Sequence, residues 1–457
     1  MVVFGFGNEN TADVSGTGMF IVYGILEKQR GMIAASIIHD NFTMPFPKGF
    51  FWGAATASHQ VEGNNHNDWT VWERQHAIQL AQASEKNFHW NPHWERFRIE
   101  ATNPDNYISG AACDHWNRFA EDFDIVHHLG LNAYRFSIEW SRVEPEEGKF
   151  DEEALTHYRE MIQALHARNI APFVTLWHWT LPLWLAEEGG VGSPRFTQVF
   201  VRYAEKVIQS FGPDIRFWVT LNEPDIYTGQ SYVRGIWPPQ KKSWLSAFTV
   251  YRKLASTHRL TYHAIKKLSP SAQIGVAKHN IWFEAANGRW LNRLLKAFID
   301  RLWNHWFLKM IQNEQDFIGL NHYNHHRIDG WYGKNENKLQ TDFGWEYYPE
   351  SLYHTLIELK QYEKPVYITE NGIADASDEL RQKFIPAALR AVEKAITEGV
   401  DARGYFYWSL LDNFEWDKGY WLRFGLIHVD RMTQKRTIRE SAQIYSALIK
   451  EYRQKEQ

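Results

Sequence analysis

Cysteine is the rarest residue in this chain, with Cys113 alone among 457 residues. A single thiol excludes an internal disulfide and fits a reducing compartment, so we expect a cytoplasmic protein. Long apolar runs are also missing, because no stretch reaches the roughly 18 residues that a membrane-spanning helix needs. Neither sign of charge is in large excess, since 50 basic residues face 54 acidic ones. This balance predicts neither a nucleic-acid nor a membrane partner.

Metal-binding motifs are absent as well. Histidines gather at His127 and His128 and again at His322, His325 and His326. Neither group has the spacing of a zinc-binding set such as H-E-x-x-H. We therefore predict no metal and no cofactor.

Residues 1–43 differ in composition from the rest of the chain. They are rich in Gly, Asn, Thr and Ser, and no Lys or Arg precedes Lys28. A secretory signal would open with a basic region, so this segment does not resemble one. We predict a poorly ordered N-terminal extension over residues 1–43 and a globular part over residues 44–457.

Short apolar runs typical of strands recur along the globular part and alternate with amphipathic helical stretches. Helices are expected to include Asp114–Leu129, Glu153–Arg168 and Phe384–Thr397. The strands are expected at Phe51–Ala55, Ala133–Ser137, Pro172–Leu176, Phe217–Leu221, Ile274–Ala277, Phe317–Leu320, Val366–Ile368 and Gly404–Tyr407. Eight βα units predict an α/β fold, a single (β/α)8 TIM barrel. A doubly wound open sheet is the alternative, but no G-x-G-x-x-G turn follows the first strand.

Tryptophan is plentiful by contrast, with 22 residues. Such rings can fill a large core or offer faces on which a ligand stacks, and we expect both uses.

Two glutamates stand out because each follows a strand-like run. Glu223 precedes Pro224, which fixes the backbone there, and Glu370 precedes Asn371-Gly372, which permits a sharp turn. Catalytic groups of parallel barrels lie at the carboxyl ends of strands, so both glutamates would face one cavity. One such glutamate alone is often a solvated loop acid. A pair around one bond is the equipment for cleaving a glycosidic linkage.

Four segments carry a resemblance to a known family. They are Phe51–Gly63, Asn222-Glu223-Pro224, Thr369-Glu370-Asn371-Gly372 and Tyr407–Trp416. On these segments the chain resembles family 1 glycoside hydrolases of the β-glucosidase and β-galactosidase type, from Phe46 to about Tyr452. The resemblance implies a retaining mechanism, in which two carboxyl groups about 5 Å apart act in turn through a covalent glycosyl-enzyme.

The resemblance also implies catalytic roles for five residues. Glu370 would be the nucleophile, and Glu223 would be the acid/base. Arg135 would hold Glu370 ionised. Tyr323 would bond Glu370, and Asn321 would assist.

Six further residues would bind the sugar by the same resemblance: Gln60, His178, Asn222, Trp408, Glu415 and Trp416. Asn222 would bond the 2-hydroxyl, and Glu415 would bond the 4- and 6-hydroxyls. The Glu415 carboxylate would also repel a 6-phosphate. The expected substrate is therefore a small unphosphorylated β-glycoside or oligosaccharide. It would be cleaved at its terminal non-reducing β-D-glucosyl residue, with galactosyl and fucosyl residues as further candidates.

The segment His279–Asp316, between the fifth and sixth predicted strands, departs from the family. It is shorter than usual and lacks the usual Gly-x-Tyr-Pro stretch, which predicts a more open cleft that accepts larger or varied aglycones. Three other interpretations of the function stay open. In a transglycosylase, an acceptor alcohol would replace water. A binding protein on an inactive barrel would lack one glutamate, and both are present. The extra Trp residues leave room for an added ligand or partner surface. The sequence predicts no oligomeric state.

Overall fold

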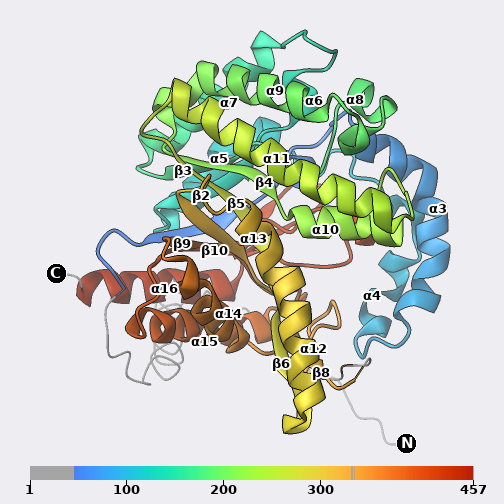
Figure 1. Ribbon diagram of the computed structural model, residues 1–457, viewed down its shortest axis with the longest axis vertical. Helices are drawn as coiled ribbons and strands as arrows, with labels where there is room; N and C mark the ends of the chain where they lie inside the picture. The colour runs from blue at the N-terminus through green and yellow to red at the C-terminus, as the bar shows by residue number, and fades with distance from the viewer. Residues whose placement is uncertain (1–45, 331–332, 334, 456–457) are drawn as a thin grey trace, which may run out of the picture. The chain divides into compact units, whose positions relative to one another are not determined.

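The computed structural model describes residues 46–330, 333 and 335–455, so the predicted extension at residues 1–43 lies outside the described residues. Eight parallel strands close into a barrel (Figure 1). In chain order they are β1 (Phe51–Ala55), β2 (Ala133–Ser137), β3 (Ala171–Thr175), β4 (Phe217–Asn222), β5 (Gln273–His279), β7 (Phe317–Asn321), β9 (Val366–Asn371) and β10 (Ala402–Trp408). Each strand pairs with the next, and β10 closes the barrel against β1. All eight predicted strands are present, which confirms the (β/α)8 barrel.

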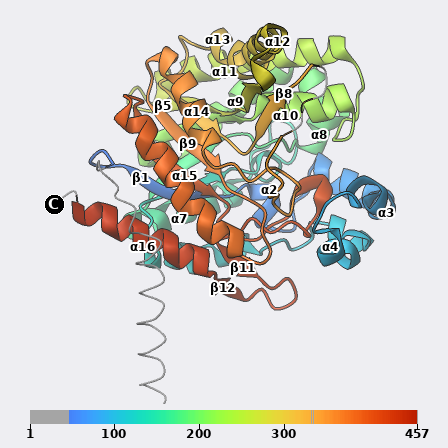
Figure 2. The same ribbon diagram turned by 90° about the horizontal axis from the view of Figure 1, so that it is seen from below.

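Helices surround the barrel (Figure 1). They are α2 (Ser58–Val61), α3 (Asp68–Phe88), α4 (Trp94–Ala101), α5 (His115–His128), α6 (Trp140–Val143), α7 (Glu152–Ala167), α8 (Leu183–Glu187), α9 (Phe196–Phe211), α10 (Pro224–Thr228), α11 (Trp244–Leu268), α12 (Trp290–Asp300), α13 (Trp306–Met310), α14 (Ser351–Leu359), α15 (Glu379–Thr397) and α16 (Glu440–Lys455). Figure 2 shows α14, α15 and α16 side by side over one flank of the barrel. The three helices predicted by range correspond to α5, α7 and α15.

Local sequence signals explain where the predicted helices begin and which face they bury. Asp151 starts α7 because its carboxylate accepts the backbone N–H groups of Glu153 and Ala154, both at 2.9 Å. Leu155 and Ile162 then lie on the buried face of the helix. This spacing of apolar residues places the helix against the barrel and leaves its polar face in water.

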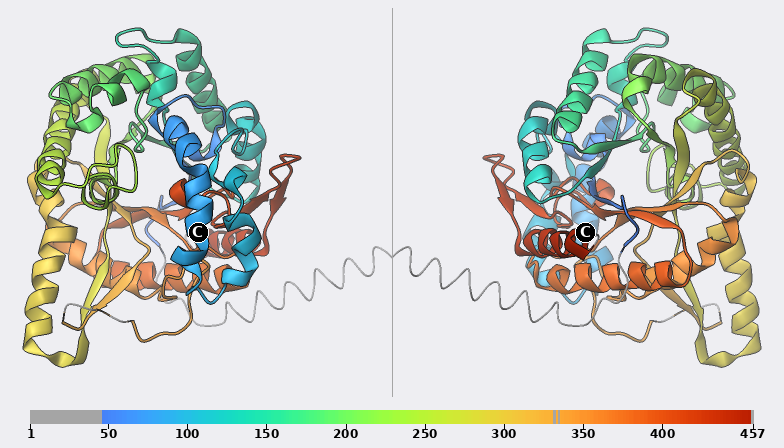
Figure 3. Two further views of the ribbon diagram at one scale, coloured as in Figure 1. Left: turned by 90° about the vertical axis from the view of Figure 1, so that its right-hand side faces the viewer. Right: turned by 90° about the vertical axis from the view of Figure 1, so that its left-hand side faces the viewer.

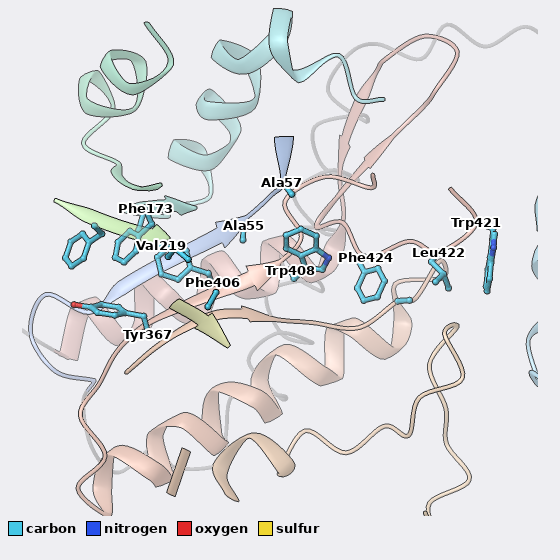
Figure 4. Packing of buried hydrophobic residues seen from close by; sticks show 14 of the residues in the cluster. Ala55, Ala57, Phe173, Val219, Tyr367, Phe406, Trp408, Trp421, Leu422 and Phe424 are labelled. Atoms are coloured by element: carbon cyan, nitrogen blue, oxygen red, sulfur yellow. The ribbon is translucent and has the colours of Figure 1, made fainter. Parts of the chain in front are cut away.

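Aromatic rings fill the inside of the barrel. The rings of Phe173 and Phe217 stack with centroids 4.2 Å apart, and Phe406 meets Phe173 edge-on at 4.7 Å. The same buried cluster continues past Trp408 to Phe424 (Figure 4). The core therefore runs directly into the wall of the cavity described below.

Two small sheets lie outside the barrel and were not predicted. β6 (Trp282–Ala285) pairs in parallel with β8 (His325–Ile328), and β11 (Ile427–Val429) pairs in antiparallel with β12 (Arg436–Ile438). Each strand is only three or four residues long, too short for a clear alternating pattern.

The segment between the fifth and sixth barrel strands holds β6, α12 and α13. Figure 3 shows α12, in yellow, at the outer edge of the barrel domain. Its side chains Trp290, Leu291, Leu294 and Phe298 are at least 60% exposed. The added ligand or partner surface suggested by the sequence stays a prediction.

Of the helices within the described residues, none combines the length and apolarity needed to cross a bilayer.

Candidate active site

A cavity of about 730 Å³ opens where the strands of the barrel end. Both Glu223 and Glu370 line it. Five other residues predicted for the site also line it, namely His178, Tyr323, Trp408, Glu415 and Trp416. The remaining four, Gln60, Arg135, Asn222 and Asn321, are almost fully buried and contact the lining residues from behind. The structure thus gathers all eleven residues around one cavity.

Glu370 lies near the end of β9, between two hydrogen-bond donors. The Arg135 guanidinium from β2 donates to its Oε1, and the Tyr323 hydroxyl donates to its Oε2 at 2.8 Å. Arg135 is 1% exposed, so water screens this ion pair very little. Burial and the charge of Glu370 hold the pKa of Tyr323 well above its usual value, so the hydroxyl keeps its proton. The two donors therefore fix the position of both Glu370 oxygens.

Glu223 lies directly after β4 in a different setting. Its backbone takes the left-handed conformation, with a φ of 41°, immediately before Pro224 begins α10. Its Oε1 accepts a hydrogen bond from the Asn321 amide at 2.9 Å. Burial first, and then the charges of Glu370 and Asp225, raise the pKa of Glu223 well above its usual value. This environment therefore favours the protonated form of Glu223, which has a proton to donate.

Two asparagines connect the glutamates. The Asn222 Oδ1 accepts from the Arg135 guanidinium at 2.7 Å and from the Asn321 amide at 3.1 Å. Arg135 also binds Glu370, and Asn321 also binds Glu223. A continuous chain of hydrogen bonds therefore fixes the two carboxyl groups relative to one another.

The same asparagine decides the tautomer of His178. With its Oδ1 occupied, the Asn222 amide directs its Nδ2 donor to the His178 Nε2 at 3.1 Å. Burial, followed by the charge of Arg135, lowers the pKa of His178 well below its usual value, so the ring is neutral. Its proton then lies on Nδ1, which has no hydrogen-bond partner within the described residues. This buried donor is free to bind a ligand hydroxyl.

Gln60 supplies the matching acceptor. Its Nε2 donates to the Phe414 carbonyl at 2.8 Å and approaches Glu415 Oε2 at 3.4 Å. Its Oε1 is buried and accepts no hydrogen bond from any residue that the structure describes. Beside it, the His178 and Trp416 rings stack with centroids 5.9 Å apart. The inner end of the cavity thus combines unpaired polar atoms with aromatic faces, as a sugar requires.

Burial changes the charge expected for Glu415. It raises the pKa of this carboxyl group to about 8, although Lys418 partly opposes the shift. The Lys418 ammonium lies only 2.5 Å from Asp417, so its charge is already paired. Near neutral pH most Glu415 carboxyl groups are therefore protonated. The predicted repulsion of a 6-phosphate needs the ionised form, so it would operate only at higher pH.

Several cavity residues were missed by the sequence analysis. Further aromatic rings line the cavity, among them Trp179, Trp237 and Trp345. His279, at the end of β5, lines it as well. Trp237 and Trp345 have no motif around them, whereas Trp179 directly follows the predicted site residue His178. The position of His279 two residues after the predicted strand Ile274–Ala277 could also have drawn attention to it.

A metal site was not predicted, and one cluster bears on that question. Asp300, His305 and Glu358 are the one group of possible metal ligands found among the described residues. The Lys296 ammonium lies 2.7 Å from Glu358 and 3.5 Å from Asp300. This ammonium occupies the place of a cation, and none of the three lines the cavity. The absence of a metal stays a prediction.

Comparison with known proteins identifies relatives over nearly the whole chain. The sequence model of glycosyl hydrolase family 1 matches residues 42–313 and 307–454. The 1,4-beta-D-glucan glucohydrolase of Thermotoga neapolitana is 33% identical over 456 residues, which cover 89% of this chain and 98% of the relative. Beta-glucosidase A of Thermotoga maritima is 33% identical over 454 residues, with the same two coverages.

Solved structures agree with these relatives. The beta-glycosidase from Pyrococcus horikoshii superimposes with a TM-score of 0.79 at 35% identity, covering 90% of this chain and 96% of that one. The beta-glucosidase from Thermotoga maritima in complex with deoxynojirimycin gives a TM-score of 0.79 at 31% identity, covering 89% and 99%. Matches of this length and identity, together with the barrel and its paired glutamates, show that the chain belongs to glycosyl hydrolase family 1.

Proposed function

We propose that this chain hydrolyses small β-glycosides at their terminal non-reducing β-D-glucosyl residue, with retention of configuration. One observation carries the proposal: two carboxyl groups in one cavity have opposite environments. Arg135 and Tyr323 bind both oxygens of Glu370, whereas burial and neighbouring negative charges keep Glu223 protonated. The named activities of the relatives, a glucohydrolase and a β-glucosidase, support the same substrate class.

In the first step Glu370 acts as the nucleophile. One of its carboxylate oxygens attacks the anomeric carbon while the bond from that carbon to the leaving oxygen breaks. Glu223 gives its proton to the leaving oxygen, so the aglycone departs as a neutral alcohol. Arg135 and Tyr323 orient the attacking carboxylate.

In the second step the roles of the charges reverse. Glu370 is now an ester and no longer repels a negative charge on Glu223. The Glu223 carboxylate removes a proton from water, and the water oxygen attacks the anomeric carbon. Glu370 leaves as a carboxylate, and Glu223 again holds a proton, so the enzyme returns to its starting state.

The inner end of the cavity supplies sugar contacts of both kinds. The unpaired His178 Nδ1–H can donate to a hydroxyl, and the unpaired Gln60 Oε1 can accept from one. Glu415 and the indole N–H of Trp416 add further polar contacts, and Trp408 offers its ring face. Asn222 would reach the 2-hydroxyl, where a hydrogen bond strengthens in the transition state. The further aromatic rings that line the cavity, among them Trp345, offer apolar faces that would suit the aglycone.

The test uses p-nitrophenyl β-glucoside with the wild type, Glu370→Ala, Glu223→Ala and the control Glu187→Ala. Glu187 is an exposed glutamate at the end of α8. We expect wild-type turnover, no turnover by Glu370→Ala, and rescue of Glu223→Ala by azide with a β-glycosyl azide product. The control should match the wild type. A folded wild type that turns over no aryl β-glycoside would contradict the proposal and favour a binding protein.

Adding an alcohol acceptor to the same assay measures transglycosylation, which stays a prediction.

A further inference from the structure

A buried ion pair lies beside the proposed acid/base. Asp225 is two residues after Glu223, in the first turn of α10, and Lys278 is the second-last residue of β5. The Lys278 ammonium lies 3.1 Å from the Asp225 Oδ2, and the two side chains are 1% and 3% exposed. We propose that this pair is a positioning device that balances the charge around Glu223, a role that rests on the proposed function of that glutamate.

The backbone fixes the pair to the reacting group. The Glu223 N–H donates to the carbonyl of Ala277 at 2.8 Å, and Ala277 directly precedes Lys278. Lys278 donates to the carbonyl of His279 at 2.5 Å, and His279 lines the cavity. One strand contact therefore holds Glu223 and Lys278 at adjacent positions, and the short α10 places Asp225 against Lys278.

The pair is poorly built for stability alone. Taking two charges out of water is costly, and the cost is recovered only where the remaining polar atoms are hydrogen-bonded. The Asp225 Oδ1 is buried and makes no hydrogen bond within the described residues. The His279 Nδ1 lies 3.7 Å from the Asp225 Oδ2 and is unpartnered in the same sense. The cost of keeping these charges inside points to a task at the neighbouring carboxyl group.

The charges of both partners act on Glu223. Burial would raise the pKa of Asp225, but Lys278 and then His279 outweigh it and lower the pKa, so Asp225 is ionised. Burial lowers the pKa of Lys278, while Asp225 and Glu223 oppose that shift. Asp225 favours the protonated form of Glu223, and Lys278 favours the carboxylate.

Several other groups also face Glu223. Glu370 from β9 and Asp225 raise its pKa, and Arg135 from β2 lowers it. The hydroxyl of Tyr323 and the rings of His178 and His279 complete the cavity around it. Against these fixed groups, the Asp225–Lys278 pair has a net charge near zero. The opposing effects of Asp225 and Lys278 on the proton of Glu223 therefore nearly cancel, so the pair does not prevent the departure of that proton to the leaving oxygen.

The experiment is the pH dependence of kcat/KM for the wild type, Asp225→Asn, Lys278→Met and the double variant. The high-pH limb reports the loss of the proton that Glu223 must donate. Asp225→Asn leaves Lys278 unbalanced, so the limb should move down by roughly one pH unit. Lys278→Met leaves Asp225 unbalanced, so the limb should move up. The double variant leaves no lone buried charge, and its limb should return close to that of the wild type.

A merely structural pair gives another result. The proposal would be overturned if the high-pH limb of kcat/KM stays in place in both single variants, or if it moves in the same direction in both. If one single variant does not fold, the other single variant and the double variant decide. The remaining single variant must still move the high-pH limb in the direction given for it. 2,4-Dinitrophenyl β-glucoside is the internal control, because its leaving group departs without a proton and its rate should not follow the displaced limb.

The same data separate this inference from the proposed function. If the wild type is inactive, or azide does not rescue Glu223→Ala, then the proposed function fails first. If both of those tests succeed and the limbs do not move in opposite directions, only the role of the Asp225–Lys278 pair is wrong.

Discussion

The two sides of the cavity surround a carboxyl group in different ways. On the side of β9, specific donors hold Glu370: Arg135 contacts one oxygen and Tyr323 the other. On the side of β4, Glu223 has a single hydrogen-bond donor among the described residues, Asn321, and its pKa depends on burial and on surrounding charges. A nucleophile needs a fixed orientation, whereas an acid/base must lose a proton once and regain one once in each cycle.

This difference indicates which kind of substitution should affect each of the two carboxyl groups. Removing a donor from Glu370 should damage orientation and charge together. Changing a charge near Glu223 should move its pKa while leaving the geometry nearly intact. The following predictions test that contrast, from the largest expected effect to the smallest.

Arg135→Met should have the largest effect. It leaves Glu370 buried without its cation, which costs about 3–5 kcal/mol of folding free energy, and kcat should fall by roughly a thousandfold or more. Denaturant unfolding and steady-state kinetics measure both effects. Arg135→Lys is the matched control, because it keeps the charge but not the guanidinium contacts to Asn222 and Glu370. Nearly full activity in Arg135→Met would contradict the role given to this side.

Tyr323→Phe should lower kcat by about ten- to a hundredfold, the value of one hydrogen bond to a charged group. The ring contacts, including the packing of Tyr323 against Trp345 at 5.6 Å, should remain. KM should change little, because the lost bond orients the nucleophile rather than the sugar. A change confined to KM would assign Tyr323 to substrate binding instead.

The glutamine variants of the two glutamates should change stability in opposite directions. The pKa of Glu223 is raised in the folded chain, so its contribution to stability is full below its ordinary value of about 4.3 and is lost as pH rises through the folded pKa. Glu223→Gln should therefore raise the melting temperature at pH 7–8. Glu370→Gln removes the partner of a buried arginine and should lower it.

The control for this pair is the pH dependence of the melting temperature. The gain in Glu223→Gln should shrink toward pH 4, where the wild-type carboxyl group is protonated in both folded and unfolded chains. Equal destabilisation by both variants at every pH would show that the two sides do not differ as described.

Glu415→Gln should have the smallest effect near neutral pH. The pKa of Glu415 is about 8, so the wild type is mostly protonated below that pH. The preference for a glucoside over its 6-phosphate should increase a fewfold in the wild type between pH 7 and 9, because the carboxylate appears over that range while the phosphate is already almost fully charged. The preference should stay flat in Glu415→Gln. The ratio of the two kcat/KM values measures it and cancels the titration of Glu223.

Much of this protein could be predicted from its sequence because its signals are local. Apolar runs such as Phe217–Leu221 predicted the barrel strands, and the carboxyl end of a parallel strand is where catalytic groups lie. Glu223 and Glu370 occur immediately after such runs and within short motifs, so their convergence on one cavity followed from fold class alone. The resemblance to the family added Arg135, Tyr323 and the sugar-binding residues, all of which the structure places around that cavity.

Only the tertiary structure decided the features that depend on side chains from separate strands. Lys278 is an ordinary lysine in the sequence, and its pairing with Asp225 arises because β5 lies against β4. Likewise, burial protonates Glu415, and the Asn222 amide fixes the tautomer of His178. The sequence alone determined which groups stand at the strand ends, since local patterns set the strands. Only the folded structure decided the protonation states of these groups, because a pKa depends on desolvation and on neighbours that are far away in the chain.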